Sequence, residues 1–518
     1  MIDEFTNFDA VEAYCGRLSY QPGQVAALHV SCTTDRFDVE VHRWGATREP
    51  VWAAKNVSGD AYATPADADA HGCDWPVAVE IPVGIDWRSG FYHVTLTAQG
   101  APADRAVFHA GFIVRAAETR ARALLVTATN TYHAYNTWGG RSLYTGGKQV
   151  SFRRPFSRGT IMRDEIERDD RKSRPTRWGE EPDVNGDIFS AFRIANNYPP
   201  SCGSTGWFHF ERRFVEWAEL DGAVFDMAAS SDLEEHPDVL DGYDLVISIG
   251  HDEYWSTGQR AALDRYVAAG GNLASFSGNT CFWQVRLDRD ANGEPSGYVC
   301  HKYSAHESDP VMGTAEQRTM SGMWADPVVG HPETALLGAG SAWGLYNRFG
   351  TATARGSGAF TVYRDDHWLF EGTDLRYGDL LGAADAVVGY ETVGCRITFD
   401  EYQLPIAAGG DGTPADIEIV AFTPSSNLGM GDYPASISAL DDQGDLEFVA
   451  SRLHGRLDDD SVARHRYGNA VMVVSRPFGP TGGEVVTVGT TDWVFGLARD
   501  AAVGQVTRNV LRRFLRTS

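Results

Sequence analysis

The chain has 518 residues, enough for two or three domains with a sizeable buried core. Hydrophobic residues make up 43% and charged residues 22%, which is the balance of a folded globular protein rather than a disordered or fibrous one. With 45 Lys and Arg against 70 Asp and Glu, the net charge is −25, so the average surface repels nucleic acid and anionic membranes. We therefore expect neither nucleic acid nor a membrane as a partner.

The seven cysteines are odd in number, widely spaced and without a Cys-x-x-Cys pair. This pattern indicates neither a disulfide framework nor a thiolate zinc site, and it is typical of a reducing compartment. The chain begins with the acidic segment MIDEFTNFDAVEAYCG, and nowhere do about 18 apolar residues occur together. We therefore expect a cytoplasmic protein with neither an export signal nor a membrane span.

Residues 18–115 alternate polar and apolar side chains with the period of β-strands, between turns rich in Gly, Pro and Asp. Short strands at this spacing predict a β-sandwich domain over residues 1–118. After Arg115 the pattern changes to AETRARALLVTATN, in which a polar stretch leads into a continuous apolar run. Such a run is typical of a buried parallel strand, which places the domain boundary near residue 118.

The rest of the chain, residues 119–518, alternates helix and strand patterns. FVEWAELDGA and STGQRAALDRYVAAGG have helical periodicity, YDLVISIG and NLASFSGN are typical of buried strands, and VGQVTRNVLRRFLR predicts a final helix. Strands and helices that alternate with short links predict an α/β domain with a doubly wound sheet. Two regions, at about residues 150–190 and 281–380, do not follow this alternation and are interpreted as insertions.

Ligands of an open α/β sheet bind beyond the carboxyl ends of its strands, so the residues that follow each buried run are candidates for a site. HDEYW follows DLVISIG, NTCFWQ follows NLASFSG, and TYHAYNTWGGRSLYTGG follows LLVTATN. Their side chains suit ligand or metal contact better than chain reversal. Two structural interpretations stay open: Asp252 or Glu253 caps the following helix, and Tyr132 and Tyr135 pack as core aromatics.

Taken together and in order, the motifs resemble the large (beta) subunit of N,N-dimethylformamidase and its relatives. The resemblance covers nearly the whole chain and rests on RLSYQPGQVAALHV, VEVHRWG, ATNTYHAYNTWGGRSLY, VISIGHDEYWS, FSGNTCFW, VVGYE, GGEVVTVGTTDWVFGL and VTRNVL. It implies a β-sandwich joined to a glutamine-amidotransferase-like α/β domain that carries the active site.

The resemblance also implies a mononuclear iron, as Fe(III), held by two tyrosines and one glutamate. By motif, these ligands fall on Tyr135, Tyr144 and Glu253, with Tyr132 and Tyr198 as alternatives to Tyr144. The same motifs place three catalytic or substrate-contacting residues around the metal: His251, Asn279 and Glu391. Two phenolates and a carboxylate are hard oxygen donors, which suit trivalent iron better than zinc.

A glutamine-amidotransferase-like fold also suggests a Cys-His-Glu triad. Cys202 and Cys281 are the candidates for its nucleophile, but neither lies in a Gly-x-Cys-x-Gly turn that would expose a thiolate. Both cysteines are therefore interpreted as small buried side chains.

The sequence thus predicts a metal-dependent amidohydrolase that cleaves the C–N bond of a small linear amide, with metal-activated water as the nucleophile. Asn279 or His251 would stabilise the developing oxyanion, and His251 or Glu391 would protonate the leaving amine. Two alternatives stay open: a non-catalytic ligand- or carbohydrate-binding protein, and a hydrolase of an ester, urea or imide. The resemblance implies a small partner subunit, and the sequence leaves open whether the chain has one or forms a homo-oligomer.

Overall fold

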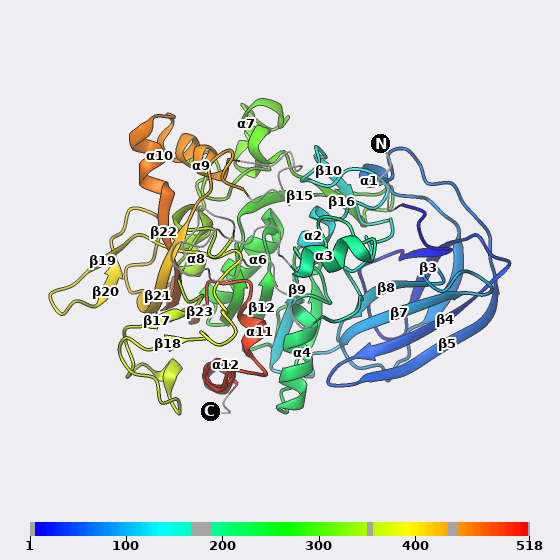
Figure 1. Cartoon of the computed structure of the whole chain (residues 1–518), viewed down its shortest axis with the longest axis horizontal. Coiled ribbons are helices and arrows are strands. Elements are labelled where there is room, and N and C mark those ends of the chain that lie inside the picture. Colours follow the sequence, from blue (N-terminus) through cyan, green and yellow to red (C-terminus); the bar gives the residue numbers. More distant parts are fainter. Residues whose placement is uncertain (1–5, 167–187, 350–355, 434–443, 516–518) are drawn as a thin grey trace. The chain divides into compact units, whose positions relative to one another are not determined.

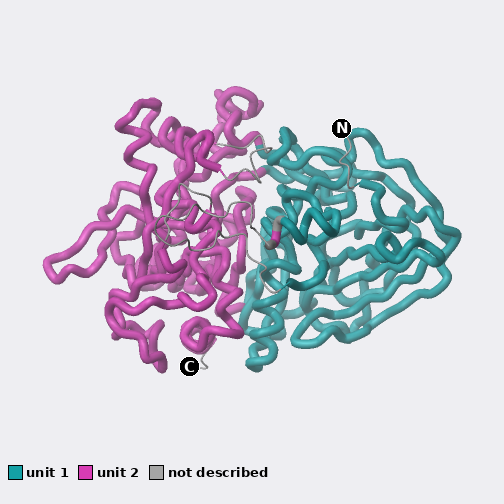
Figure 2. Tube along the Cα trace, viewed as in Figure 1, with its two compact units in different colours: residues 1–169, 191–242, 286–300 teal, residues 170–190, 243–285, 301–518 magenta. Residues whose placement is uncertain are grey.

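A computed structural model describes residues 6–166, 188–349, 356–433 and 444–515. The chain divides into two compact units (Figure 2): unit 1 comprises residues 1–169, 191–242 and 286–300, and unit 2 comprises residues 170–190, 243–285 and 301–518. Residues 167–187, which belong to the insertion expected at 150–190, lie outside the described residues. The domain boundary near residue 118 and the insertion at 281–380 stay predictions.

The amino-terminal part of unit 1 contains two β-sheets that share one apolar core (Figure 1). One sheet has the strand order β1-β3-β6 and the other has the order β2-β8-β7-β4-β5. The strands are β1 (Val11–Cys15), β2 (Ser19–Tyr20), β3 (Val25–Cys32), β4 (Arg36–Trp44), β5 (Arg48–Ser58), β6 (Val77–Pro82), β7 (Gly90–Ala98) and β8 (Val107–Val114). Leu28 of β3 and Val94 of β7 are both buried in the shared core, as the inner faces of a β-sandwich require.

The strands predicted for this region are confirmed, with two differences. β1 and β5 are additional strands, and β2 pairs with β8 in parallel rather than antiparallel. β5 lies at the edge of its sheet, and its residues are exposed or half-buried. Because neither face of β5 is buried, its sequence does not alternate polar and apolar residues, and the pattern does not predict this strand.

Two further pairs of strands belong to unit 1. β9 (Ala123–Thr127), the predicted buried run, pairs in parallel with β11 (Asp226–Ala229), and β10 (Gln149–Ser151) pairs antiparallel with β16 (Pro295–Val299). The helices of this unit include α1 (Ala68–His71), α2 (Thr129–Ala134), α4 (Glu211–Leu220) and α5 (Asp232–Glu235). Two elements, α3 (Ile188–Ala195) and β15 (Trp283–Arg289), contain residues of both units.

Unit 2 contains a mixed sheet with the strand order β12-β14-β23-β22-β21-β17-β18 (Figure 1). The strands are β12 (Leu245–His251), β14 (Asn272–Gly278), β23 (Val485–Thr487), β22 (Tyr467–Ser475), β21 (Glu418–Ser426), β17 (Phe360–Val362) and β18 (Leu380–Leu381). β12, β14 and β23 run parallel, as expected for a doubly wound sheet, whereas the other pairs are antiparallel. Residues 476–484 join β22 to β23 and are too few for the crossover that a parallel pair needs.

The helix predicted after HDEYW is α6 (Thr257–Ala268), which connects β13 (Tyr254–Ser256) to β14. Its N-cap is Ser256, whose side chain accepts a hydrogen bond of 3.1 Å from the backbone N–H of Gln259. Gly270, with φ 103°, follows its carboxyl end. Asp252 and Glu253 therefore do not cap this helix, and the capping interpretation is wrong.

The remaining described elements of unit 2 are short, apart from three helices. They are α7 (Ala305–Ser308), α8 (Thr334–Leu337), β19 (Ile397–Phe399), β20 (Pro405–Ala407), α9 (Asp445–His454), α10 (Asp459–Arg466), α11 (Trp493–Gly496) and α12 (Ala501–Phe514), with 3-10 turns at Lys302–Ser304, Gln317–Thr319, Ser341–Trp343 and Trp368–Phe370. α12 is the predicted final helix. Within the described ranges, no helix combines the length and apolar character that a membrane crossing needs.

Candidate functional site

Two neighbouring strands of unit 2 end side by side and supply two of the predicted site residues. β12 is buried along its whole length and ends at His251. His251 pairs with Gly278, the last residue of β14. Asn279, the next residue after Gly278, therefore lies close to His251. The structure thus brings His251 and Asn279 together at the carboxyl ends of parallel strands, where α/β proteins bind ligands.

Glu391 reaches the same edge from a distant part of the chain. Its backbone carbonyl accepts a hydrogen bond of 3.0 Å from Thr491 N–H, and the residue forms an isolated antiparallel bridge with Tyr346. Gly278 permits this approach, because a Cβ atom there would lie 2.4 Å from the Glu391 carbonyl oxygen and 2.5 Å from the Thr491 nitrogen. A glycine is therefore required at the end of β14.

The side chains of these residues form one buried cluster. His251 Nε2 lies 2.7 Å from Glu391 Oε2 and 3.2 Å from Glu253 Oε2. The Asn279 side-chain amide donates to Glu391 Oε2 over 3.1 Å. His251, Glu253, Asn279 and Glu391 are each at most 5% exposed. All four predicted site residues of unit 2 therefore meet in one place.

Burial and charge act in opposite directions on His251. Burial favours the neutral imidazole, but the nearby carboxylates of Glu391 and Glu253 outweigh it and raise the pKa of His251 well above its ordinary value. Burial raises the pKa of Glu391 as well, against the opposing positive charge of His251. With 2.7 Å between His251 Nε2 and Glu391 Oε2, the pair has the geometry to share a proton.

Two further residues belong to this cluster and were not predicted. The Tyr390 hydroxyl lies 3.2 Å from His251 Nδ1, and the Ser341 hydroxyl donates a hydrogen bond of 2.6 Å to Asn279 Oδ1. Tyr390 lies in the VVGYE motif, next to Glu391, and that proximity is a signal in the sequence. Ser341 lies in the segment GAGSAWG, which matches no catalytic pattern.

The two predicted metal-ligand tyrosines come together in unit 1. Tyr135 follows α2, and Tyr144 lies in the next loop; their rings stack with centroids 4.1 Å apart and an angle of 29° between the planes. The loop returns to the helix end because Leu143 N–H donates to the Ala134 carbonyl over 3.0 Å. Tyr135 is buried and Tyr144 is half-buried.

A buried guanidinium fixes the backbone between these tyrosines. Arg154 is 1% exposed and donates hydrogen bonds to the carbonyl oxygens of Asn136 and Trp138. The Asn136 side chain in turn donates to the Pro155 carbonyl over 2.9 Å. The backbone that follows α2 is therefore fixed at Asn136 and Trp138.

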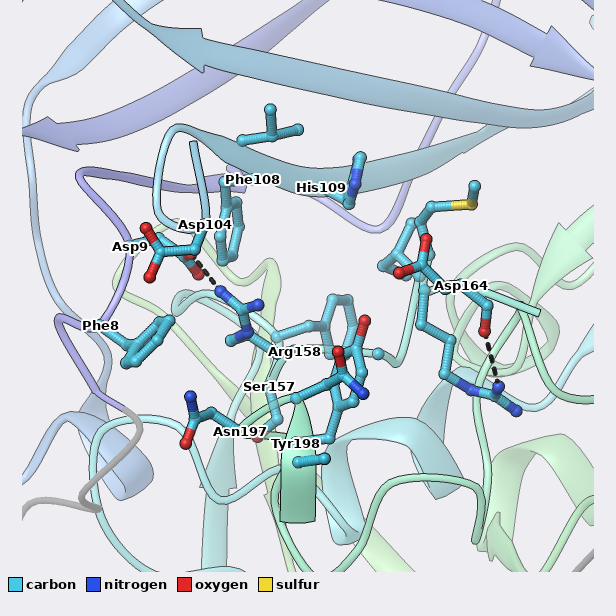
Figure 3. Close-up of a pocket in the computed structure, with 18 of the residues that line it drawn as sticks. Phe8, Asp9, Asp104, Phe108, His109, Ser157, Arg158, Asp164, Asn197 and Tyr198 are labelled. Carbon is cyan, nitrogen blue, oxygen red and sulfur yellow. Dashed lines mark hydrogen bonds and ion pairs between the residues drawn. The ribbon is translucent and has the colours of Figure 1, made fainter. Parts of the chain in front are cut away.

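The alternatives for the second tyrosine lie elsewhere in unit 1. The Tyr132 ring packs against Phe156 in a T-shaped contact, with centroids 6.2 Å apart. Tyr198 lines a cavity of about 490 Å³ (Figure 3), and the Arg158 guanidinium lies 5.7 Å from the centre of its ring. None of the six predicted site residues lines this cavity, in which Arg158 pairs with Asp9. Tyr144, in contrast, stacks on Tyr135.

The predicted metal ligands fall into two sets, because Tyr135 and Tyr144 belong to unit 1 and Glu253 belongs to unit 2. That these three side chains meet around one ion stays a prediction. Among the described residues, no group of three or more His, Cys, Asp or Glu side chains is arranged to hold a metal ion. A site made of two phenols and one carboxylate does not depend on such a group.

The thiol alternative does not fit the surroundings of Cys281. Cys281 is fully buried, and burial raises the pKa of its thiol well above the ordinary value, although the Arg260 guanidinium lies 3.7 Å from the sulfur. A thiol in this state is not a nucleophile at neutral pH. All seven cysteines lie within the described residues, are buried and form no disulfide.

Comparison with known proteins identifies the family of this chain. The model of the family described as N,N-dimethylformamidase beta subunit-like, C-terminal, matches residues 36–507 of this chain, and it confirms the resemblance that the motifs indicate. A comparison with curated proteins gives no match. The family match includes every predicted site residue and most of both units. The chain therefore belongs to the N,N-dimethylformamidase beta subunit-like family.

Proposed function

We propose that the protein is an iron-dependent hydrolase that cleaves the C–N bond of a small linear amide. The family to which it belongs is named after an amide hydrolase. The observation that carries the proposal is the buried cluster of His251, Glu253, Asn279 and Glu391 at the carboxyl ends of β12 and β14. Ionisable groups with shifted pKa values gathered in one place are typical of catalytic sites. We further propose that the part of the chain with parallel strands is a glutamine-amidotransferase-like domain.

In this proposal Tyr135, Tyr144 and Glu253 hold the iron. The stacking of the two phenol rings supports Tyr144 as the partner of Tyr135. Three anionic oxygen donors fit a ferric ion, whose charge also favours deprotonation of phenols with an ordinary pKa of about 10. When bound, a ferric ion supplies Lewis-acid activation of an amide carbonyl and of water.

The other three residues bind the reacting atoms and move the proton. Asn279 donates a side-chain N–H to the carbonyl oxygen, on which negative charge develops as water adds to the carbonyl carbon. As the C–N bond breaks, the leaving amine takes a proton, and the His251–Glu391 pair holds one in reach of the same edge. The attacking water gives up a proton as its oxygen bonds to the carbonyl carbon, and that proton replaces the one that the His251–Glu391 pair donates to the amine. The products are a carboxylic acid and an amine, and the pair returns to its starting protonation state.

The name of the family indicates an assembly of more than one kind of subunit among its members. For this chain we propose a homo-oligomer or a complex with a small subunit as the working form. The molar mass of the active species in solution, measured by light scattering, distinguishes these two from a monomer.

The test begins with metal analysis and a visible absorption spectrum of protein purified without chelators. Phenolate bound to ferric iron gives a charge-transfer band, so we expect coloured protein that contains iron. Tyr135→Phe, Tyr144→Phe and Glu253→Ala should each lose colour and iron together, whereas Tyr402→Phe, at a tyrosine that is 76% exposed, should keep both.

Turnover of a panel of formamides and acetamides completes the test, with iron content measured in every sample. Fully active protein without iron would overturn the iron requirement. Iron-loaded protein that hydrolyses no amide but does hydrolyse an ester, urea or imide would move the proposal to that bond, and the absence of any turnover would favour a binding protein.

A further inference from the structure

The side chain of Asn279 is held at both ends. Its Oδ1 atom accepts a hydrogen bond of 2.6 Å from the Ser341 hydroxyl, and its Nδ2 atom donates one of 3.1 Å to Glu391. Asn279 is 2% exposed and Ser341 is 1% exposed, so bulk water does not compete for these bonds. A side-chain amide carries two hydrogens on Nδ2, and one of them stays available after the bond to Glu391.

The two ends of an asparagine side chain have nearly the same shape, so packing alone does not fix which end is which. Here the contacts fix it, because the ionised carboxylate of Glu391 accepts only and the hydroxyl of Ser341 can donate. The opposite orientation would set Asn279 Oδ1 against a carboxylate oxygen of Glu391, two acceptors at about the distance of a hydrogen bond. The observed orientation also fixes the direction of the second N–H.

Ser341 itself has little freedom to move. It opens the 3-10 turn Ser341–Trp343, and the preceding Gly340 exchanges two backbone hydrogen bonds, of 2.7 and 3.0 Å, with Gly394. The fully buried side chain of Glu333 packs beside the preceding Gly340. A Cβ atom at Gly340 would lie 2.3 Å from Glu333 Oε1, so a larger residue there would have to displace the buried Glu333 side chain.

The next residue of the turn is anchored as well. The carbonyl oxygen of Ala342 accepts from Asn427 over 3.1 Å and lies 3.0 Å from Nδ1 of His465. The hydroxyl of Ser341 therefore sits on a backbone that is fixed on both sides. Such a rigid support is what a preorganised catalytic hydrogen bond needs.

We propose that Ser341 is a positioning residue, which holds the side-chain amide of Asn279 so that its second N–H is aimed at the carbonyl oxygen of the substrate. This inference rests on the proposed function, in which Asn279 is the donor to that oxygen. Ser341 does not touch the substrate itself. Its whole contribution to the reaction passes through Asn279.

A double-mutant cycle between Ser341→Ala and Asn279→Ala tests this role. In the wild-type background, Ser341→Ala should lower kcat about 10-fold, the worth of one hydrogen bond, and leave KM nearly unchanged. In the Asn279→Ala background the same substitution should change kcat little, because the group that it positions is already gone. Ser341→Cys, which keeps the shape and a weak donor, should fall between wild type and Ser341→Ala.

The matched control is Ser475→Ala. Ser475 is 4% exposed, and among the described residues its hydroxyl has no hydrogen-bond partner. It pairs with Val485, at the end of the parallel strands opposite to Gly278. This variant should retain wild-type kcat.

Equal losses of kcat in both backgrounds, or no loss in the wild-type background, would overturn the positioning role. If the protein hydrolyses no amide, the four proteins of the cycle (wild type, Ser341→Ala, Asn279→Ala and the double variant) are compared by the midpoint of urea unfolding. A non-additive shift would then support the Ser341–Asn279 link while the proposed function fails, and additive shifts would overturn the link too.

Discussion

Replacement of Glu391 by glutamine separates proton transfer from iron binding. Glu391 lies 2.7 Å from His251 Nε2 and accepts from Asn279, but it is not among the proposed iron ligands. Glutamine keeps the size of the side chain and removes the negative charge that raises the pKa of His251. The pKa of His251 should therefore be lower in the variant. We expect Glu391→Gln to retain iron and colour and to lose activity.

The expected magnitude distinguishes two causes. Loss of one charge-assisted hydrogen bond is worth about 1.5–3 kcal/mol, which corresponds to at most about 160-fold in rate. Loss of a general acid or base lowers kcat by about 10²–10⁴-fold, or roughly 2.7–5.4 kcal/mol. A decrease of about 10³-fold or more therefore exceeds what the broken contact alone explains.

The assay is steady-state hydrolysis of the best amide substrate across pH 5 to 9, with iron determined in each preparation. NMR titration of the histidines should show a lower pKa for His251 in the variant. Activity that decreases only in proportion to iron would make Glu391 a structural residue. Activity within about threefold of wild type would refute its role in proton transfer.

Three other perturbations follow from the structure. Gly278→Ala should lower the free energy of unfolding by about 1–3 kcal/mol and reduce kcat, because the added Cβ would clash with backbone atoms. Gly356→Ala, whose added Cβ has no atom within 4 Å, should change neither; denaturant unfolding and kcat measurements test both variants. Burial raises the pKa of Glu12 to about 8, so wild-type stability should fall as pH rises from 4.5 to 8. Glu12→Gln should make this decrease smaller without abolishing it, because burial also raises the pKa of Asp9, to about 7; unfolding free energies of both proteins at pH 5.5 and 9 decide it. Cys281→Ser should keep kcat within about twofold, and mass spectrometry after iodoacetamide treatment should find Cys281 unlabelled in the folded wild type.

Elements with a strong local pattern are the ones that the sequence predicts. β12 and β14 are short, buried strands of mostly apolar and small residues, and α6 combines a Ser256 cap with a glycine stop. The antiparallel half of the unit 2 sheet has no comparable signal. β21 includes Pro424 and pairs with β22 through a register shift, so its identity as a strand depends on its neighbours.

The site follows the same rule. His251 and Asn279 are predictable because they follow apolar runs whose carboxyl ends must share an edge. Glu391 comes from a segment 112 residues beyond Asn279 and has no local signal, so only the family motif points to it. Ser341, 62 residues from Asn279, has neither kind of signal. Contacts between distant loops depend on how the whole chain folds.

The two carboxyl groups that follow β12, Asp252 and Glu253, are not explained by capping of the next helix. Ser256 already caps α6, so the helix does not need Asp252 or Glu253. Both are nearly fully buried, and burial raises the pKa of Asp252 to about 6 even though Ser248 donates a hydrogen bond to it. Burial of a charged group costs several kcal/mol, and apolar side chains of similar size would pack there without that cost. In the proposed function, the stability given up by burying Glu253 and Glu391 beside His251 provides an iron ligand and a proton donor at the end of this strand.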